Sequence, residues 1–518
     1  MPRNDISAFV AEAAADVPDR QALVESGGRS LTWAALEDEV SRIATGLGVH
    51  GIRAGQRVMI AVGNRIEFVT AYLGVLRAQV VAVPVNPRSA PGEVARMVAD
   101  SGTRLVVADS TALDVVRAGL AELAAAGEVP APTLVVVGAE PGEGEHAFAE
   151  LRADVVRPVP PLPDPEKLAA LLYTSGTSGR PRAAMLSHRA LLANIEQVAA
   201  VEPPMMHGDD VVLGVLPLFH VYGLNAVLGG VLRHRARLLL VEKFDPQAVL
   251  DLIDDEACSV VPIAPPAFAH WLPDEHLRER LGPVRLVLSG SAPLEASVIE
   301  EFTGITGIPV HQGYGLTEAS PVVTSTLCSA DPAPGSVGAA LPGIELRLVD
   351  ETYGQVEGED PGQIQVRGDN LFSGYWPDGA DGPDAEGWYA TGDVGFLDAG
   401  GDLFLVDRVK ELIIVSGFNV YPTEVEDVIR EVDGVTDVAV IGAPDPETGE
   451  AVVAYVVASR PLTHLEEAVR AHAVVRLARF KQPTRIEVVD ALPLTVTGKV
   501  QKGRLRGLER RRQLGLLE

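Results

Sequence analysis

A loop of six small polar residues separates a short apolar run from a helical pattern. Its sequence, Thr174 to Gly179 (TSGTSG), holds four hydroxyls and two glycines, and Arg180, Pro181 and Arg182 follow. Glycine lets the backbone approach a ligand closely, while hydroxyls and backbone amides donate hydrogen bonds to phosphate oxygens. The loop therefore suits anion binding, although it lacks the Gly-Lys-Ser/Thr ending of a P-loop. Taken alone, such a loop is more often a surface turn.

Four further motifs follow this loop along the chain. They are GYGLTE at 313–318, YATGD at 389–393, DRVKELIIVSGFNVYPTE at 407–424 and PLTVTGK at 493–499. Together with the loop they resemble the signatures of the adenylate-forming superfamily, which comprises acyl-CoA synthetases, luciferases and the adenylation domains of nonribosomal peptide synthetases. The resemblance spans essentially the whole chain, and five motifs in the right order are far more specific than one Ser/Gly loop.

The resemblance implies an ATP site built from several motifs. The β- and γ-phosphates would be held by Thr174, Ser175, Gly176, Thr177, Ser178 and Gly179. Adenine would be recognised and stacked by the segment Gln312, Gly313, Tyr314 and Gly315. The ribose hydroxyls would donate to Asp393, and Arg408 would contact ribose or phosphate.

The resemblance also implies the charged groups of the first chemical step. Thr317 would donate to the α-phosphate, and Glu318 would bind Mg²⁺, a hard cation that prefers carboxylate oxygen. Lys499 would lie over the α-phosphate and the substrate carboxylate, where an ammonium lets two anions approach each other. From the residues alone, Glu318 is equally explained as a charge at a helix N-terminus. Lys499, with Lys502 and Arg504, is equally explained as a solvated basic face.

Two positions after the phosphate loop depart from the family pattern. Arg182 stands where a lysine is usual, and Ala183 where a glycine is usual. Arginine keeps the positive charge and offers a bidentate fork, so we expect Arg182 to bind phosphate. Alanine is less permissive than glycine, so we expect a less mobile loop.

Two segments follow predicted strand ends, where ligands bind in open α/β sheets. His220 lies in LPLFHVYG, and a lone histidine among apolar residues is more often a packed structural residue. The resemblance makes His220 the gate of the acyl pocket, with a general-base role as the weaker alternative. The second segment would pack against adenine and the acyl group through Gly290, Ser291, Ala292 and Pro293.

The reaction implied by the resemblance has two steps. A carboxylate attacks the α-phosphate of Mg·ATP to give acyl-adenylate and pyrophosphate, and the thiol of CoA then displaces AMP. No covalent enzyme nucleophile is needed. Lys410 would be the hinge about which a mobile C-terminal domain turns between the steps, and Gly417 would line the pantetheine tunnel.

Residues 217–230 and 312–324 are expected to line the acyl pocket. They contain neither Lys nor Arg, which disfavours dicarboxylates such as malonate. Small residues there would leave room for an apolar chain, namely Gly223, Ala226, Gly229 and Gly230. A medium- or long-chain fatty acid is the first choice and an aryl acid the second.

Other acceptors and a second class of protein stay open at this point. The acyl group could pass to a separate acyl carrier protein or to a nitrogen nucleophile in place of CoA. A non-catalytic relative that only binds ATP or acyl groups is less favoured, because Glu318, Asp393 and Lys499 are all present.

Alternating strand and helix patterns on both sides of the loop predict two doubly wound, mostly parallel α/β subdomains. Closely spaced short strands over 335–406 predict a small β-barrel or antiparallel sheet. The remainder resembles a compact α+β unit, with a final basic helix over 503–517. We expect an N-terminal adenylation domain at 1–408 and a mobile C-terminal domain at 409–518.

The amino-acid composition limits which binding partners and which cellular compartment are expected. With 43 basic and 71 acidic residues the net charge is −28, which argues against binding to nucleic acid or anionic membranes. The two cysteines, Cys258 and Cys328, argue against a disulfide framework and favour the cytoplasm. The N-terminus has acidic residues where a signal peptide needs an apolar core, and no apolar run reaches membrane-span length. A homodimer is kept as an option.

Overall fold

The computed structural model divides the chain into two compact units. It describes residues 4–127, 130–174, 181–291, 294–350, 354–356, 360–408, 411, 413–415, 418–445, 448–459, 464–477, 479–495 and 498–513. Unit 1 comprises residues 1–176, 181–345 and 367–389, and unit 2 comprises residues 177–180, 346–366 and 390–518. The predicted boundary at 408 concerns which part moves, and it stays a prediction.

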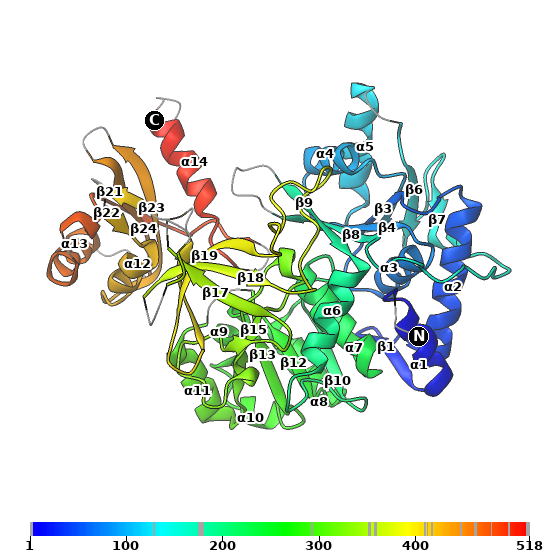
Figure 1. Cartoon of the computed structure of the whole chain (residues 1–518), viewed down its shortest axis with the longest axis horizontal. Helices are drawn as coiled ribbons and strands as arrows, with labels where there is room; N and C mark the ends of the chain where they lie inside the picture. Colours follow the sequence, from blue (N-terminus) through cyan, green and yellow to red (C-terminus); the bar gives the residue numbers. More distant parts are fainter. Residues whose placement is uncertain are drawn as a thin grey trace. The chain divides into compact units, whose positions relative to one another are not determined.

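Unit 1 contains two mostly parallel sheets covered by helices, as predicted (Figure 1). The first sheet has seven strands, in the order β7 (His146–Ala147), β6 (Thr133–Val137), β5 (Leu105–Asp109), β3 (Arg57–Ala61), β4 (Val81–Pro84), β8 (Leu168–Thr174) and β9 (Arg182–Ser187). The second also has seven, in the order β14 (Val310–Gln312), β13 (Leu286–Ser289), β12 (Val260–Ile263), β10 (Val211–Gly214), β11 (Arg237–Leu240), β1 (Gln21–Glu25) and β2 (Ser30–Thr32). Among the described strands of these two sheets, only the edge strands β9 and β2 pair antiparallel with their neighbours.

Several of these strands were not predicted, including β1, β2, β6, β7, β9 and β14. The first strand of the chain, β1, pairs in parallel with β11, with Leu23 opposite Leu238, so the N-terminal segment completes the second sheet. Strand β9 lies between the phosphate loop and the following helix, and residues 183–187 of it are buried. Its register places Arg182 opposite Thr174. Strands β8 and β9 therefore form an antiparallel pair before the helix begins.

The helices of unit 1 alternate with its strands. They are α1 (Ala8–Asp16), α2 (Trp33–Val49), α3 (Ile66–Arg77), α4 (Pro91–Ser101), α5 (Leu113–Ala126), α6 (His188–Ala199), a π-helix (Tyr222–Gly229), α7 (Gly230–His234), α8 (Pro246–Asp255), α9 (Pro266–Trp271), α10 (Leu277–Arg280) and α11 (Ala296–Thr306). Helix α6 begins where predicted, because the Ser187 hydroxyl accepts from the Ala190 amide at 3.2 Å and so caps the first turn. Figure 1 shows α6 beside α7, and it also contacts the π-helix.

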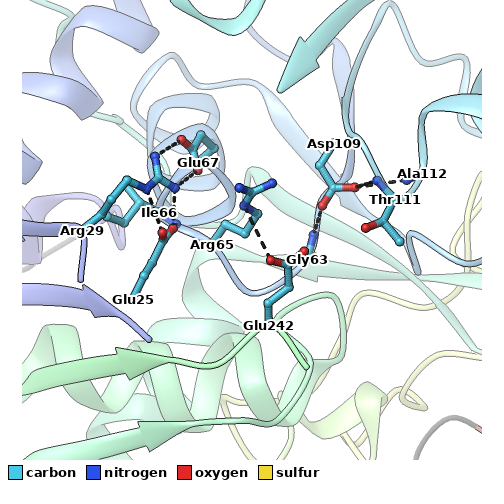
Figure 2. A network of polar contacts seen from close by, with 10 residues as sticks. All are labelled: Glu25, Arg29, Gly63, Arg65, Ile66, Glu67, Asp109, Thr111, Ala112 and Glu242. Carbon is cyan, nitrogen blue, oxygen red and sulfur yellow. Dashed lines mark hydrogen bonds and ion pairs between the residues drawn. The ribbon is translucent and has the colours of Figure 1, made fainter. Parts of the chain in front are cut away.

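Charged side chains connect the two sheets of unit 1 (Figure 2). Arg29 lies between Glu25, at the end of β1, and Glu67, in the first turn of α3, with an N–O distance of 2.6 Å to each. Arg65, just before α3, faces Glu242, just after β11, at 4.0 Å. Because α3 follows a strand of the first sheet, these contacts join it to strands of the second.

Unit 2 contains two smaller sheets. The four-stranded sheet has the order β17 (Glu345–Val349), β18 (Gly362–Arg367), β19 (Tyr389–Leu397) and β20 (Leu403–Arg408). The five-stranded sheet has the order β22 (Phe418–Val420), β21 (Ile413–Val415), β24 (Gly449–Ala458) and β23 (Val435–Asp445), with β25 (Arg485–Val489) paired to β24. Its helices are α12 (Pro422–Arg430), α13 (Leu465–Arg476) and α14 (Lys502–Gln513). Among all the described helices, none combines the length and apolarity needed to cross a bilayer.

Candidate functional site

The predicted adenine segment follows the carboxyl end of β14, beside the end of β13. The two strands are in register, with Ser289 opposite Gln312, so the segments that leave them start at one edge of the sheet. Gln312 is buried, and its side-chain oxygen accepts from the Leu294 amide at 3.1 Å. The fold therefore brings the predicted segments 290–291 and 312–315 together.

Gly313 and Gly315 allow two backbone segments to approach closely. A Cβ at Gly313 would lie 2.5 Å from the Thr324 carbonyl oxygen, and one at Gly315 would lie 2.5 Å from the Pro321 carbonyl oxygen. The Tyr314 amide also donates to the Thr324 hydroxyl at 3.2 Å. These two glycines thus have a packing reason for their identity, independent of any nucleotide.

Glu318 lies in a short 3₁₀ turn, Thr317–Ala319, with only 8% of the residue exposed. Its Oε1 accepts from the phenol of Tyr375 at 2.5 Å. The Glu318 carbonyl accepts from the Phe372 amide at 2.9 Å, and the Ala319 carbonyl accepts from the Asn370 side chain at 2.7 Å. The predicted metal ligand is therefore a fixed, buried carboxylate and not a charge at the surface.

The buried side-chain amides of two asparagines also hold the chain that follows Glu318. Asn225, in the π-helix, donates to the Ser320 carbonyl at 2.6 Å. Asn194, in α6, donates to the Val322 carbonyl at 2.8 Å and accepts from the Val322 amide at 3.0 Å. The helix that follows the phosphate loop thus positions the turn that carries Glu318.

Arg182, the departure from the family pattern, begins β9 and lies beside the same tyrosine. Its Cζ lies 3.8 Å from the centroid of the Tyr375 ring, and its Nη1 pairs with Asp381 at 2.7 Å. The Thr174 hydroxyl donates to the Arg182 carbonyl at 3.4 Å. Burial raises the pKa of Tyr375, and the nearby charge of Glu318 raises it further, so its phenol is a hydrogen-bond donor at neutral pH.

Several predicted site residues lie outside the described residues. They are Ser175, Gly176, Thr177, Ser178 and Gly179 of the phosphate loop, together with Ala292, Pro293, Lys410 and Gly417. The described contacts in unit 1 connect Thr174 to Arg182, Arg182 to Tyr375 and Tyr375 to Glu318. The other predicted site residues described in unit 1 are Gly290, Ser291, Gln312, Gly313, Tyr314, Gly315 and Thr317.

His220 lies in the loop between β10 and the π-helix and is half-buried. Its Nδ1 accepts from the Tyr222 amide at 3.3 Å. Asn64, buried after β3, fixes the start of this loop by donating to the Leu216 carbonyl at 2.8 Å and accepting from the Leu218 amide at 2.9 Å. The position of His220 thus depends on a residue just after a strand of the first sheet, which no motif marks.

Three of the small residues expected to leave room for an acyl chain are closely packed. A Cβ at Gly223 would lie 2.3 Å from the Pro217 carbonyl oxygen, and one at Gly229 would lie 2.7 Å from Ile195. One at Gly230 would lie 2.9 Å from the sulfur of Met206. The sequence suggested a cavity from small size alone. In the structure these glycines let the π-helix and α7 pack closely against neighbouring chain.

Enlarging Gly223 should therefore cost stability before it changes selectivity. We expect Gly223→Ala to lower the free energy of unfolding by about 1–3 kcal/mol, the usual range for overpacking. Denaturant unfolding of the full chain measures it. Gly304→Ala is the matched control, because this glycine of α11 has no atom within 4 Å of an added Cβ, and alanine should be neutral or stabilising there. Equal midpoints for both variants would contradict the packing assigned to Gly223.

A tyrosine ring borders the segment that follows β13. A Cβ at Gly290 would lie 2.7 Å from Cε1 of Tyr222, so the ring lies directly against this glycine. Tyr222 is the first residue of the π-helix. Such helices are rare in proteins, and those that occur are often found at functional sites. Beside it, Ser291 has a left-handed φ of 77°.

Unit 2 carries three of the predicted residues, two on paired strands and one in a turn. Asp393 is half-buried on β19 and lies opposite Arg408 of β20. Lys499 is exposed and closes a tight turn, because its amide donates to the Thr495 hydroxyl at 3.0 Å and its carbonyl accepts from the Thr495 amide at 2.7 Å. The alternative of one solvated basic face is wrong for Lys502, whose ammonium pairs with Glu426 at 2.9 Å and is largely buried.

Mg²⁺, implied by the resemblance, can be tested against the donors present. Glu318 offers a buried carboxylate, with the Thr317 hydroxyl in the same turn. Within the described part of the chain, no three His, Cys, Asp or Glu side chains gather as a metal site. A single carboxylate fits Mg²⁺, which keeps most of its ligands as water and substrate phosphate.

Sequence reasoning missed Tyr375 and Asn64, and it included Tyr222 only as one residue of the range 217–230. Tyr375 is 57 residues from Glu318, and no periodicity links them. A usable signal was the segment NLFSGYW at 370–376, whose aromatic residues follow a predicted strand with no helical or strand pattern of their own.

Comparison with known proteins gives matches along nearly the whole chain. The family model of AMP-binding enzymes matches residues 10–376, and the model of their C-terminal domain matches residues 424–499. The 4-coumarate–CoA ligase-like protein 9 of Oryza sativa subsp. japonica is 34% identical over 515 residues, covering 96% of this chain and 91% of that protein. The long-chain-fatty-acid–CoA ligase of Bacillus subtilis is 31% identical over 534 residues, covering 98% and 94%.

A solved structure has the same fold. ATP-bound MatB from Rhodopseudomonas palustris superposes with a TM-score of 0.87 at 33% identity, covering 97% of this chain and 98% of that one. The resemblance drawn from the five motifs is therefore confirmed over both parts of the chain.

Proposed function

Since this chain belongs to the family of AMP-binding enzymes, and its relatives are CoA ligases, we propose that it joins an apolar carboxylic acid to CoA. The acid attacks the α-phosphate of ATP, forming acyl-adenylate and releasing pyrophosphate. The thiol of CoA then attacks the acyl carbon, and AMP leaves. The observation that carries the proposal is the gathering of Thr174, Arg182 and Glu318 within unit 1, beside the adenine segment.

In this proposal the residues bind ATP and neutralise the charges of the reacting groups. Thr174 and its loop hold the β- and γ-phosphates, with Arg182 as a cation at the base of the loop. Gln312 and Tyr314 border the adenine, while Asp393 accepts from the ribose. Lys499 neutralises the two anions that meet in the first step, and the part of the chain after residue 408 turns about Lys410 for the second.

Glu318 is the residue that would hold Mg²⁺. Bound there, the ion would neutralise phosphate charge as the α-phosphorus is attacked. The protein's own contribution is a carboxylate that is buried and already oriented by the Tyr375 phenol.

For the acid, we favour an aryl carboxylate over the fatty acid that the small residues first suggested. Gly223, Gly229 and Gly230 face packed neighbours, which removes the reason for expecting a long apolar channel there. The ring of Tyr222 lies against Gly290, in the segment expected to pack on the acyl group, and an aromatic ring there favours an aromatic substrate because aromatic rings pack well on one another. Similarity to a 4-coumarate–CoA ligase-like protein supports this choice, and similarity to a fatty-acid ligase keeps the alternative.

A panel of aryl and alkyl acids in a pyrophosphate-release assay, followed by mass analysis of products formed with CoA, tests the proposal. Release with no acid of either class would contradict it. Acyl-AMP that accumulates and reacts only with an amine or a carrier protein would replace CoA as the acceptor.

Tyr222 should set the preference between the two classes. We expect Tyr222→Ala to lower the ratio of kcat/KM for aryl over alkyl acids by roughly tenfold, the upper scale of one aromatic contact. Tyr222→Phe keeps the ring and should leave the ratio unchanged. An unaltered ratio in Tyr222→Ala would remove this residue from the acyl pocket.

A further inference from the structure

Tyr375 has a backbone fixed to the strand that follows the phosphate loop. Ala184 of β9 forms a bridge with Tyr375, and the Trp376 amide donates to the Ala183 carbonyl at 2.9 Å. The Ser373 amide donates to the Met185 carbonyl at 2.9 Å. The segment 373–376 therefore extends the edge of the first sheet, and its position follows that of β9.

The side chain of Tyr375 is enclosed by three groups of different chemistry. The Cζ atom of Arg182 lies 3.8 Å from the centroid of the Tyr375 ring. The ring of Phe372 packs against it in a T-shaped arrangement, with 5.1 Å between the ring centroids. The phenol meets Oε1 of Glu318 at 2.5 Å. A ring held by a cation and an aromatic edge has little rotational freedom, so its hydroxyl has one direction in which to donate.

The side chain of Tyr375 therefore contacts both Glu318, the proposed metal ligand, and Arg182, the proposed phosphate contact. Glu318 belongs to the turn after β14, whereas Arg182 belongs to β9 of the other sheet. Apart from Tyr375, the turn at Glu318 is tied to neighbouring chain mainly through backbone carbonyls, which do not orient the carboxylate.

We propose that Tyr375 is a positioning residue that orients the Glu318 carboxylate for the divalent cation of ATP. The phenol occupies one carboxylate oxygen and fixes the plane of the group before the cation arrives. Without the phenol, the carboxylate becomes ordered only when the cation binds. The loss of its conformational entropy then makes the binding free energy less favourable. This inference rests on the proposed ATP-dependent function, but its effect falls on metal-assisted nucleotide binding.

The test compares ATP binding to the full chain with and without the cation. Isothermal titration calorimetry gives the Kd for ATP in excess EDTA and in saturating Mg²⁺. We expect Tyr375→Phe to leave the Kd in EDTA unchanged and to raise the Kd in Mg²⁺ roughly tenfold, the scale of a hydrogen bond to a charged group. Titrating Mg²⁺ at fixed ATP in the adenylation assay should raise the half-saturating Mg²⁺ concentration with little change in kcat.

Tyr173→Phe is the matched control. It also removes a phenol–carboxylate hydrogen bond, from Tyr173 to Asp100 at 2.7 Å, on the neighbouring strand β8. Both Kd values should match those of the unaltered chain. Glu318→Gln should abolish the effect of the tyrosine, so Tyr375→Phe made in that background should change neither Kd.

Three results would overturn the inference. They are an unchanged Kd in Mg²⁺, a tighter one, or equal weakening with and without Mg²⁺, which would indicate a general structural role. Failure of the proposed function is distinguishable, because it would appear as absent pyrophosphate release by the unaltered chain while its ATP binding still reported on Tyr375.

Discussion

Glu318→Gln is expected to lower Mg²⁺-dependent adenylation by about 10²-fold or more while the protein stays folded, because the metal neutralises developing phosphate charge. The substitution keeps the size of the side chain and removes its negative charge. Glu318 is buried, with its Oε1 bonded to Tyr375, so a neutral amide of the same shape can be accommodated. Pyrophosphate release at saturating acid, ATP and Mg²⁺ measures the loss.

A surface carboxylate in the same unit provides the control. Glu345 pairs with Arg367 at 2.5 Å, but its side chain is 59% exposed, and such pairs contribute little. Glu345→Gln should therefore leave adenylation unchanged. A folded Glu318→Gln variant with near-normal activity would show that Glu318 acts only within its turn and that the cation is held elsewhere.

Local patterns were enough to predict the fold class of this chain and many of its strands. Apolar runs such as Arg57–Ala61 are strands because parallel sheets covered on both faces need continuous apolar sequence, and Ser187 marks the start of α6 because its hydroxyl caps the first turn. The five motifs identified the family, which the matches along the chain confirm.

Long-range pairing could not be read from the same patterns. Strand β1 joins the second sheet through β11, although more than two hundred residues separate Leu23 from Leu238. The role of Gly223 was misjudged for a related reason, since a small residue signals either a cavity or a close contact, and only the position of Pro217 distinguishes them. Tyr375 meets Glu318 because segment 373–376 pairs with β9, a strand that was itself not predicted.

The last prediction separates the two half-reactions. Lys499 is proposed to bridge the carboxylate and the α-phosphate only while their bond forms. Lys499→Ala should therefore lose adenylation by roughly 10²–10³-fold, the scale of one preorganised electrostatic contact, and should still convert supplied acyl-adenylate and CoA to thioester. Pyrophosphate release measures the first step, and mass analysis of the thioester measures the second.

The neighbouring cation Arg504 gives the control for charge alone. Arg504 is exposed and lies five residues from Lys499, so Arg504→Ala should spare both steps if position matters more than local charge.

Lys410→Pro should show the reverse of Lys499→Ala. Proline fixes φ and would hinder a turn at the proposed hinge, so this variant should keep adenylation and lose thioester formation. A folded Lys499→Ala variant that is equally impaired in both steps would contradict alternation of the C-terminal part, even if the chain proved to be an acyl-CoA ligase. The split between the two steps would show that Lys499 acts in the first step alone, as alternation of the C-terminal part requires.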